Sequence, residues 1–547
     1  MDRQSAAVAN SSQSPAKRLR IGFIHPDLGI GGAEKLVVDA ALSLQRLGHE
    51  VEIYTSHHDR NHCFEPTRDG SLKVHVMRSY LPRSIADSFH LPLAIARQMS
   101  LVFQLILSIT LFNYPGTLPS FLWPALTSAQ PTQPFDLYFI DQLSAGIPWL
   151  KIVTSTRVIY YCHFPDKDVG NSIAMQRAIA RGQSGPSALR KLYRIPLDLF
   201  EEGTTDYADK ILVNSEFTSK QFQKSFFRLN RQPRVLYPGI DHDEYTPERV
   251  SEKLRELEED AGGDRIKAAV TQLCKSSSRP TFVSINRFEA KKNIALAVEA
   301  FASAKEQYQA SSKKLRLILA GGYDKRVRDN IDTLNELKKL CEERKLKHLV
   351  LSFNRPEFQP PESAPSLREM ERDYDVFFLL SSPGPLLHTL LLSESTVALL
   401  YTPTEEHFGI VPLEAMACGV PVLSTNTGGP VETVVDLALN DEGEVTNEKA
   451  TGMLRHASAP IWSHSMILLL QLDPQRRITI SNSAKERVKQ TFSIQKMSVD
   501  LERACYETLE KGHVRSEEGL LQWGSTIGIF IVMMATFVAN VYLSQKP

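Results

Sequence analysis

The chain has 547 residues, of which 42% are apolar and 23% charged, and this composition allows two or more globular domains with substantial cores. The 63 Lys and Arg residues balance the 63 Asp and Glu residues, so no bulk field attracts nucleic acid, and any phosphate ligand must be bound by local features. The six cysteines lie too far apart for a disulfide framework or for a zinc site built from close pairs.

The first elements form a βαβ pattern. Residues 1–18 are polar without an apolar stretch, which predicts a disordered leader and disfavours a cleaved secretory signal. An apolar strand at 20–26 is followed by a glycine turn, a helix with apolar residues at helical spacing, and a strand at 51–56. This order predicts a parallel sheet with crossover helices, and later short apolar runs extend it into a first lobe over residues 19–240.

An uncharged segment, residues 98–135, interrupts this lobe. Its first part is strongly apolar, but Pro115, Pro119 and Pro124 follow, so it is too broken for a clear membrane span. We expect a re-entrant or interfacial hairpin at a membrane. A helix buried in the domain and followed by a loop is the alternative.

A second lobe is predicted over residues 241–510. A turn-rich stretch at 237–247 separates it from the first lobe, and a charged surface helix is expected at 248–262. Short apolar strands then alternate with helices again. Two doubly wound, Rossmann-like α/β lobes are the economical fold, with a ligand site in the cleft between them, because such sheets bind ligands beyond the carboxyl ends of their strands.

The end of the chain is expected to be a transmembrane anchor. Residues 519–545 carry no charge and would form roughly 37 Å of helix, enough to cross a hydrocarbon core of about 30 Å. A buried core helix is the alternative. With no signal peptide ahead of this segment, the two lobes are expected to remain in the cytosol.

The glycine turn PDLGIGGAEK follows the first strand. Gly31 and Gly32 are expected to cradle a phosphate at a helix N-terminus, with a purely structural tight turn as the alternative. A dinucleotide oxidoreductase is disfavoured, because Glu34 occupies the place of the third glycine and the next strand ends in Thr55 and Ser56.

The most specific pattern is a pair of glutamates, Glu406 and Glu414, on either side of a turn that contains Phe408 and Gly409. Carboxylates accept hydrogen bonds from sugar hydroxyls, and backbone amides at a glycine turn can face a phosphate. Taken alone, two such glutamates are more often solvated surface residues.

This stretch resembles the E-x7-E signature of the family-four retaining glycosyltransferases, which have the two-lobed GT-B fold. The resemblance extends from about residue 20 to residue 505. Three further motifs agree with it in order: the glycine loop Gly31-Gly32-Ala33-Glu34, the donor-phosphate motif Asn286-Arg287-Phe288-Glu289-Ala290-Lys291-Lys292-Asn293, and the glycine turn Gly428-Gly429-Pro430-Val431-Glu432.

The resemblance implies roles for several residues. Arg287 and Lys292 would neutralise the donor pyrophosphate without a metal ion, Glu414 would bind the ribose, and Glu406 would contact the transferred sugar. The sequences Asp166-Lys167-Asp168 and Asp241-His242-Asp243 have no context that supports a metal site. The implied donor-binding set is Gly31, Gly32, Arg287, Lys292, Phe408, Gly409 and Glu414.

A second resemblance is narrower. The segments YYCHFPD at 160–166 and YTPTEEHFGIVPLEAM at 401–416 are similar to the eukaryotic α-1,3/1,6-mannosyltransferases of dolichol-linked oligosaccharide assembly. This similarity implies GDP-mannose as donor, a mannosyl-chitobiosyl-diphosphodolichol acceptor, and successive α-1,3 and α-1,6 additions at the cytosolic face of the endoplasmic reticulum membrane. It also admits a complex with other mannosyltransferases of that pathway. His163 would contact the mannose or assist the reacting centre, although a lone histidine is more often structural.

Some questions stay open at this level. A retaining double displacement needs a carboxylate nucleophile about 5 Å from its partner, and the sequence identifies none, so same-face attack is favoured, with His163, Glu406, Arg287 and Lys292 as the catalytic set. A catalytically silent scaffold, or a transferase for another donor or another lipid such as a phosphoinositide, are the alternatives. The long polar stretch at 167–191 and the segment 381–388 depart from the family pattern and leave the acceptor contacts open.

Overall fold

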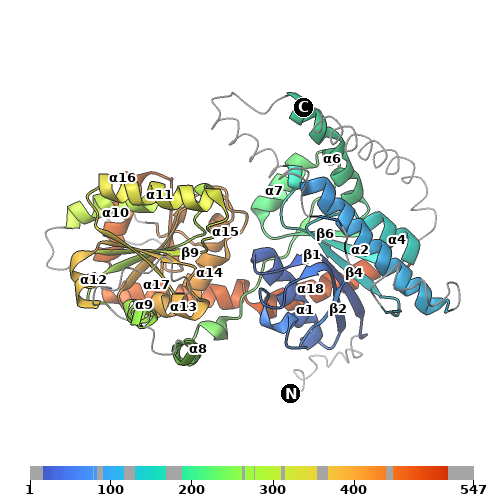
Figure 1. Ribbon diagram of the computed structural model, residues 1–547, viewed down its shortest axis with the longest axis horizontal. Helices are drawn as coiled ribbons and strands as arrows, with labels where there is room; N and C mark the ends of the chain where they lie inside the picture. The colour runs from blue at the N-terminus through green and yellow to red at the C-terminus, as the bar shows by residue number, and fades with distance from the viewer. Residues whose placement is uncertain are drawn as a thin grey trace, which may run out of the picture.

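Two parallel sheets of seven strands each form two lobes that lie side by side (Figure 1). This computed structural model describes residues 17–77, 79, 81–82, 90–115, 130–167, 188–260, 265–275, 277–308, 314–353, 367–438 and 447–514. Most of the predicted leader and the whole predicted anchor at 519–545 lie outside these residues. The predicted pair of Rossmann-like α/β lobes is confirmed.

The first sheet has the strand order β3-β2-β1-β4-β5-β6-β7, and every pairing is parallel. Buried apolar residues such as Phe23, Ile53 and Phe139 align across its centre, because both faces of the sheet are covered by helices. The strands are β1 Arg20–Leu28, β2 Glu50–His58, β3 Lys73–Val76, β4 Leu137–Asp141, β5 Arg157–Cys162, β6 Lys210–Val213 and β7 Arg234–Val235, and the helices are α1 Gly32–Arg46, η1 Glu65–Thr67, α2 His90–Asn113, α4 Ile147–Thr154, α6 Ala188–Asp206 and α7 Glu216–Ser225.

The second sheet has the order β10-β11-β9-β8-β12-β13-β14, again all parallel. Its strands are β8 Thr281–Ile285, β9 Arg316–Gly321, β10 His348–Ser352, β11 Val376–Leu380, β12 Thr396–Tyr401, β13 Val422–Thr425 and β14 Gly452–Arg455. The helical elements that follow β7 in the described residues are η3 His242–Tyr245, α8 Pro247–Asp260, α9 Arg265–Lys275, η4 Ala290–Lys292, α10 Ala295–Gln307, α11 Arg328–Glu343, α12 Leu367–Asp373, α13 Gly384–Leu392, α14 Ile410–Ala417, α15 Pro430–Thr433, α16 Ala459–Gln471, α17 Pro474–Thr491 and α18 Ile494–Leu509.

Each sheet has a point where the order of its strands reverses. In the first sheet this point lies between β1 and β4, and in the second it lies between β8 and β12. Loops that leave the carboxyl ends of such neighbouring strands run in opposite directions and open a crevice that binds ligands. The two crevices therefore mark where functional side chains should gather.

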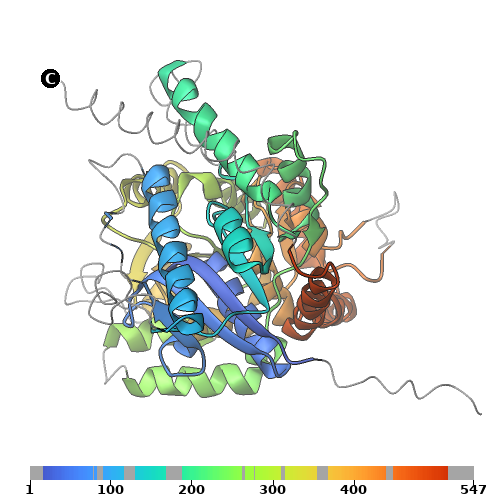
Figure 2. The same cartoon turned by 90° about the vertical axis from the view of Figure 1, so that its right-hand side faces the viewer.

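The uncharged segment 98–135 begins within α2, which lies beside α4 over the first sheet (Figure 2). Leu101, Val102 and Leu105 are buried in the core, and Gln98 donates to the Leu143 carbonyl oxygen at 2.8 Å. Helix α2 is long and apolar enough to cross a membrane, but 56% of its most apolar window is buried. For α2, the structure agrees with the alternative of a domain helix rather than with the expected hairpin, and residues 116–129 lie outside the described part.

The last helix corrects the expected second lobe at 241–510. Helix α18 returns to the first lobe, where it lies next to α1 (Figure 1). Its buried residues Met497, Leu501 and Cys505 belong to the core around β1 and β2. This return could not be predicted, because an amphipathic helix shows which face is buried but not which sheet covers it.

Two segments of the chain cross between the lobes, and they lie against each other. The Ile240 amide donates to the Phe492 carbonyl at 2.9 Å, and the Ile494 amide donates to the Ile240 carbonyl at 3.0 Å. A side chain at Gly239 would place its Cβ 2.7 Å from the Cα of Ile494, so the close approach requires glycine. Tyr237 packs edge-to-face against Phe492 at the same place, with ring centroids 5.1 Å apart.

Replacing Leu501 by Ala should destabilise the first lobe, although the residue comes after the second lobe in sequence. Leu501 is fully buried, and a cavity of this kind costs about 2–5 kcal/mol in the free energy of unfolding. Val499→Ala is the matched control, since Val499 is 47% exposed on the same helix. Denaturant unfolding of both variants measures the difference, and equal small losses would contradict the placement of α18.

Candidate active site

An ion pair between Lys292 and Glu406 lies at the crevice of the second sheet. Lys292 ends η4 after β8, and Glu406 follows β12, so the two motifs come from the strands on either side of the reversal. The Lys292 ammonium donates to Glu406 Oε2. The Thr402 hydroxyl donates to the Lys292 carbonyl at 2.6 Å and so fixes the backbone of the lysine loop to the end of β12.

Glu406 is held in its ionised form. Burial alone would raise the pKa of this carboxyl group, but the charge and hydrogen bond of Lys292 outweigh it and lower the pKa below the usual value. An ionised carboxylate is a strong acceptor for sugar hydroxyls. The pair therefore has one group suited to a sugar and one suited to a phosphate.

Arg287 differs from Lys292 in its surroundings. Its side chain is 63% exposed and pairs with Glu289 at 2.9 Å, whereas the side chain of Lys292 is only 12% exposed. The predicted partners of a donor pyrophosphate thus lie on the same loop but not in the same environment. Arg287 has room to move toward a ligand.

Helix α14 begins at this crevice. Gly409 precedes it with a φ of +87°, a conformation that favours glycine, and a Cβ there would lie 3.2 Å from the Tyr401 ring. Behind it, a Cβ on Gly428 would lie 2.5 Å from the Glu406 carbonyl oxygen, and one on Gly429 would lie 2.4 Å from the Phe408 Cα. The turn at Gly428 and Gly429 therefore shapes the loop from Glu406 to Gly409. This loop leads into the N-terminus of α14, which is a favourable place for an anion.

Glu414 and Phe408 are less accessible than the sequence suggested. Glu414 is partly buried on α14, accepts a hydrogen bond from the Tyr245 hydroxyl at 3.2 Å, and has a pKa raised by burial. The Phe408 side chain is 4% exposed and packs against Tyr237 and Phe492 at the crossing, with centroids 5.9 Å from each. Phe408 could contact a donor only through its backbone, and its side chain supports the loop.

The glycine turn of the first lobe faces α14. A Cβ on Gly32, at the start of α1, would lie 3.9 Å from Ile410 Cδ1 of the other lobe. A Cβ on Gly31 would lie 2.3 Å from Glu34 Oε2, so this glycine makes room for a carboxylate that folds back over the helix N-terminus. Gly31 and Gly32 do border the cleft, while the phosphate-cradling role stays a prediction.

Two histidines share one buried aspartate at the crevice of the first sheet. Asp141, the last residue of β4, lies 2.8 Å from His25 Nδ1 and 2.9 Å from His163 Nε2. His25 and Asp141 are fully buried, whereas the His163 side chain is 19% exposed. The carboxylate orients the His163 ring, so His163 is the member of this group that can meet a substrate.

The buried His25 and Asp141 side chains stabilise each other's charged forms. Although burial opposes its protonation, the carboxylate of Asp141 raises the pKa of His25 to about 10. Burial likewise opposes ionisation of Asp141, but the two histidines lower its pKa. No role was predicted for His25 or Asp141 from the sequence. Both lie toward the carboxyl ends of strands, which is a position typical of functional residues, but only the sheet order shows that their two strands are neighbours.

The two motif segments of the narrower resemblance meet across the cleft. The Phe164 ring lies 3.7 Å from the His407 ring, and the Ser215 hydroxyl donates to the His407 carbonyl. On the second lobe, Glu432 accepts the amides of Glu216 and Phe217 at 2.8 and 2.7 Å and so caps the N-terminus of α7 on the first lobe. These contacts join the two described lobes across the cleft.

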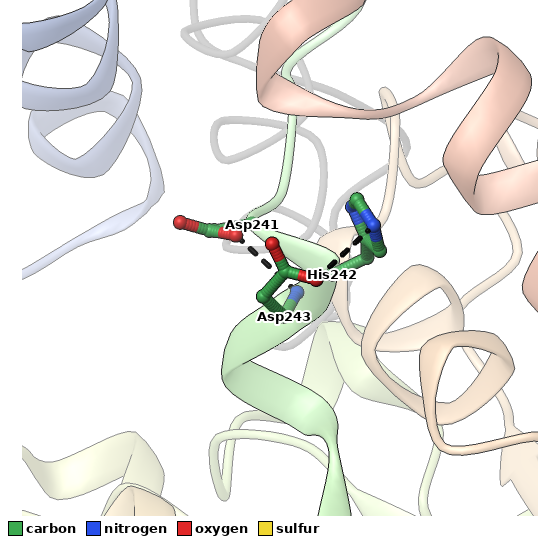
Figure 3. Close-up of side chains that lie close together, drawn as sticks. All are labelled: Asp241, His242 and Asp243. Carbon is green, nitrogen blue, oxygen red and sulfur yellow. Dashed lines mark hydrogen bonds and ion pairs between the residues drawn. The ribbon is translucent and has the colours of Figure 1, made fainter. Parts of the chain in front are cut away.

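The cluster Asp241-His242-Asp243 lies on the crossing segment (Figure 3). Its possible ligand atoms lie within 4.8 Å of one another. Asp241 accepts the Asp243 amide at 3.3 Å, and the Asp241 and His242 side chains point away from each other on either side of Asp243. This is a local turn in which Asp243 is exposed and Asp241 partly buried, and its three possible ligands are fewer than the six to eight oxygens that a calcium ion takes.

Comparisons with known proteins agree with this geometry. The model of Glycosyltransferase Family 4 matches residues 30–244, and that of Glycosyl transferases group 1 matches residues 266–363 and 367–459. A sucrose-phosphate synthase from Thermosynechococcus elongatus shares the fold with a TM-score of 0.60 at 17% identity, covering 90% of this chain and 100% of the other. HepE of Anabaena, solved in complex with UDP and glucose, gives 0.54 at 15% identity over 90% and 100%. The fold and the two facing crevices are those of a GT-B glycosyltransferase.

Closer relatives narrow the class. The alpha-1,3/1,6-mannosyltransferase ALG2 of Rhizomucor pusillus is 38% identical over 94% of this chain and 97% of its own length. The protein of the same name in Saccharomyces cerevisiae is 36% identical over 94% and 90%. The chain belongs to the family of ALG2 alpha-1,3/1,6-mannosyltransferases.

Replacing Asp141 by Asn should lower the free energy of unfolding by an amount that depends on pH, because it removes the carboxylate that the two histidines share. The raised pKa of His25 means that its ion pair stabilises the folded state at neutral pH and that this contribution is lost as the pH rises through about 10. We expect a loss of about 3–5 kcal/mol at neutral pH, as for a broken buried ion pair, and a smaller difference from wild type near pH 10. Thermal unfolding across this range measures it, with Asp59→Asn on the exposed loop after β2 as control, and a difference independent of pH would contradict the account.

Proposed function

We propose that this chain is a retaining mannosyltransferase that moves mannose from GDP-mannose to a mannosyl-chitobiosyl-diphosphodolichol acceptor, first in an α-1,3 and then in an α-1,6 linkage. Membership of the ALG2 family supports the activity. The observation that carries the proposal is the Lys292–Glu406 pair at the crevice of one sheet, opposite the Asp141–His163 pair at the crevice of the other. A transfer reaction needs both a donor site and a site for the attacking hydroxyl, and the two crevices supply them.

Lys292 and Arg287 would bind the donor diphosphate together with the N-terminus of α14. The Lys292 ammonium has three donors, of which Glu406 takes one, so it can bind a phosphate oxygen without leaving the pair. Arg287 would swing in from its exposed position beside Glu289. Fixed donors that face the leaving group stabilise the charge that develops as the glycosidic bond breaks.

Glu406 and His163 would hold the sugar. Glu406, ionised and tied to Lys292, would accept hydrogen bonds from mannose hydroxyls, and His163, oriented by Asp141, would face the reacting centre. In same-face attack, the acceptor hydroxyl passes its proton to the departing phosphate oxygen. This step needs no carboxylate nucleophile and no metal ion, because Arg287 and Lys292 balance the phosphate charge.

We further propose that the enzyme works at the endoplasmic reticulum membrane with both lobes on the cytosolic side. The uncharged segment 519–545 supports membrane attachment. A lipid-linked acceptor also requires that the cleft lie near the membrane surface.

Detergent-solubilised protein incubated with GDP-mannose and a mannosyl-chitobiosyl diphospholipid should yield products heavier by one and then two hexoses. Product masses followed over time measure this. We expect the same yield with a chelator present, because cationic side chains take the place of a metal. No added hexose would contradict the proposed reaction, and loss of product with chelator alone would contradict the metal-independent mechanism.

Lys292→Gln should lower the rate of transfer by about ten- to more than a hundredfold, because one charged hydrogen bond contributes roughly 1.5–3 kcal/mol. Lys291→Gln is the matched control: its side chain is 57% exposed and pairs with Glu289 on the same loop. Initial rates and unfolding temperatures of both variants separate catalysis from stability. Equal rates in the two variants would show that Lys292 has no special role.

A further inference from the structure

We propose that the first lobe carries a second ligand site, separate from the cleft, that binds the phosphate of an anionic lipid. The site consists of a basic pocket and an adjoining apolar groove at the amino-terminal edge of the first sheet. Asp209 immediately precedes β6, and Arg157 is the first residue of β5, whereas Asp141 and His163 lie at the other ends of the strands. At about 3.3 Å per residue, the length of β5 puts the two sites roughly 20 Å apart.

The basic pocket is a cavity of about 470 Å³ with a surplus of positive charge. Its charged lining residues are four cations, Lys151, Arg157, Arg231 and Lys511, and two carboxylates, Asp206 and Asp209. The lining therefore carries two positive charges in excess, which matches the charge of about −1.5 to −2 on a phosphate monoester.

The carboxylates cannot neutralise all four cations. Lys151 Nζ and Arg157 Nη1 both approach the same Asp209 oxygen at 2.8 Å, and the other oxygen accepts the Val158 amide at 2.9 Å. Arg231 lies 3.8 Å from Asp206 and donates to backbone carbonyls. Lys511 donates to the Asp209 carbonyl at 2.6 Å rather than to a carboxylate.

The crowding of cations affects Lys511 directly. Its pKa is lowered, because partial burial and the nearby charges of Arg231, Lys210 and Lys151 outweigh the attraction of Asp209. An incoming phosphate would relieve this repulsion. Phosphate is also the group that lysine and arginine donors bind best together.

A purely structural role accounts for part of the cluster. Arg157 donates to the carbonyls of Gly512, Lys511 and His513 at 2.7–3.1 Å and so ties the end of α18 to the sheet. That role uses the buried Arg157, whose side chain is 6% exposed. It does not require the exposed ammonium of Lys511 or the surplus of charge.

The apolar groove decides the class of ligand. A second cavity of about 790 Å³ shares Arg157 with the basic pocket, so the two adjoin at that residue. Its apolar lining consists of Leu19, Pro134, Phe135, Tyr506 and Leu509, and besides Arg157 its charged lining residues are Lys17, Asp136 and Glu510. A free phosphate would leave this groove unused, whereas a lipid would place its head group among the cations and its chain along the apolar side chains.

The position of the site along the chain agrees with this occupant. Lys511 and His513 are followed, after five more residues, by the uncharged segment 519–545. Basic residues beside such segments lie where anionic head groups are concentrated. A bound lipid would fix the base of the first lobe to the membrane surface without entering the cleft.

The test uses the full-length chain in detergent with long-chain phosphatidic acid as the probe, and native mass spectrometry and fluorescence titration measure binding. Lys511→Glu should weaken binding about tenfold or more, because it removes one cation and adds a repulsive charge. The matched control is Lys496→Glu, an exposed lysine on α18 that pairs with Asp500 away from the pocket. Unfolding temperature and transfer to a short-chain acceptor should be unchanged in both variants.

Three outcomes would overturn the proposal. Equal affinity in Lys511→Glu and wild type would show that the pocket is not the site. Equal affinity for glycerol 3-phosphate, which lacks the chain, would assign the pocket to a free phosphate. Equal binding of long-chain phosphatidylcholine would show that the excess charge is not recognised. Because transfer is measured separately, failure here leaves the proposed mannosyltransferase activity untouched.

Discussion

The rest of the structure depends on the paired crossing of the chain between its two lobes. A single crossing would leave the lobes free to turn about one linker, but here the segments around Ile240 and Ser493 form a β-bridge. The bridge is possible because Gly239 lets two backbones approach where any side chain would collide with Ile494. Phe408 packs into the same place, so the crossing also fixes the loop that carries Glu406. The hinge and the donor loop thus share one aromatic cluster.

This constraint explains why the charges are divided between the lobes. The second lobe presents the N-terminus of α14 with Lys292 and Arg287, all of which favour an anion. The first lobe presents His163, held by a carboxylate that a charged His25 balances from behind. In the proposed reaction, the negatively charged leaving group would bind to the surface of the second lobe. The attacking hydroxyl would lie at the surface of the first lobe. Placing each set on a separate rigid sheet lets the lobes close without rebuilding either crevice.

Much of the fold could be predicted from the sequence because the strands are short, apolar and regularly separated by helices. Glu406 and Lys292 could be selected because their motifs resemble those of the family-four glycosyltransferases, and His163 because the segment YYCHFPD resembles the narrower family. Asp141 and His25 could not, because they are 116 residues apart and only the order β1-β4 brings them together. Phe408 was assigned to the donor because it lies within the motif that resembles the family-four signature, and only packing against Tyr237 and Phe492 shows its supporting role. The return of α18 depends in the same way on contacts distant in sequence.

The first sheet uses its two edges for different physical tasks. At the carboxyl edge, Asp141 keeps a charged histidine buried, which is costly and is tolerated because the network orients His163. At the amino edge, Asp209 is shared by two cations and leaves further positive charge beside an apolar groove, close to the point where the chain leads into its uncharged end. An enzyme whose acceptor is anchored in a lipid layer must bring its cleft to that layer in a fixed orientation. A site that holds a lipid at the edge opposite the chemistry would fix the orientation of the lobe while leaving the cleft free to open.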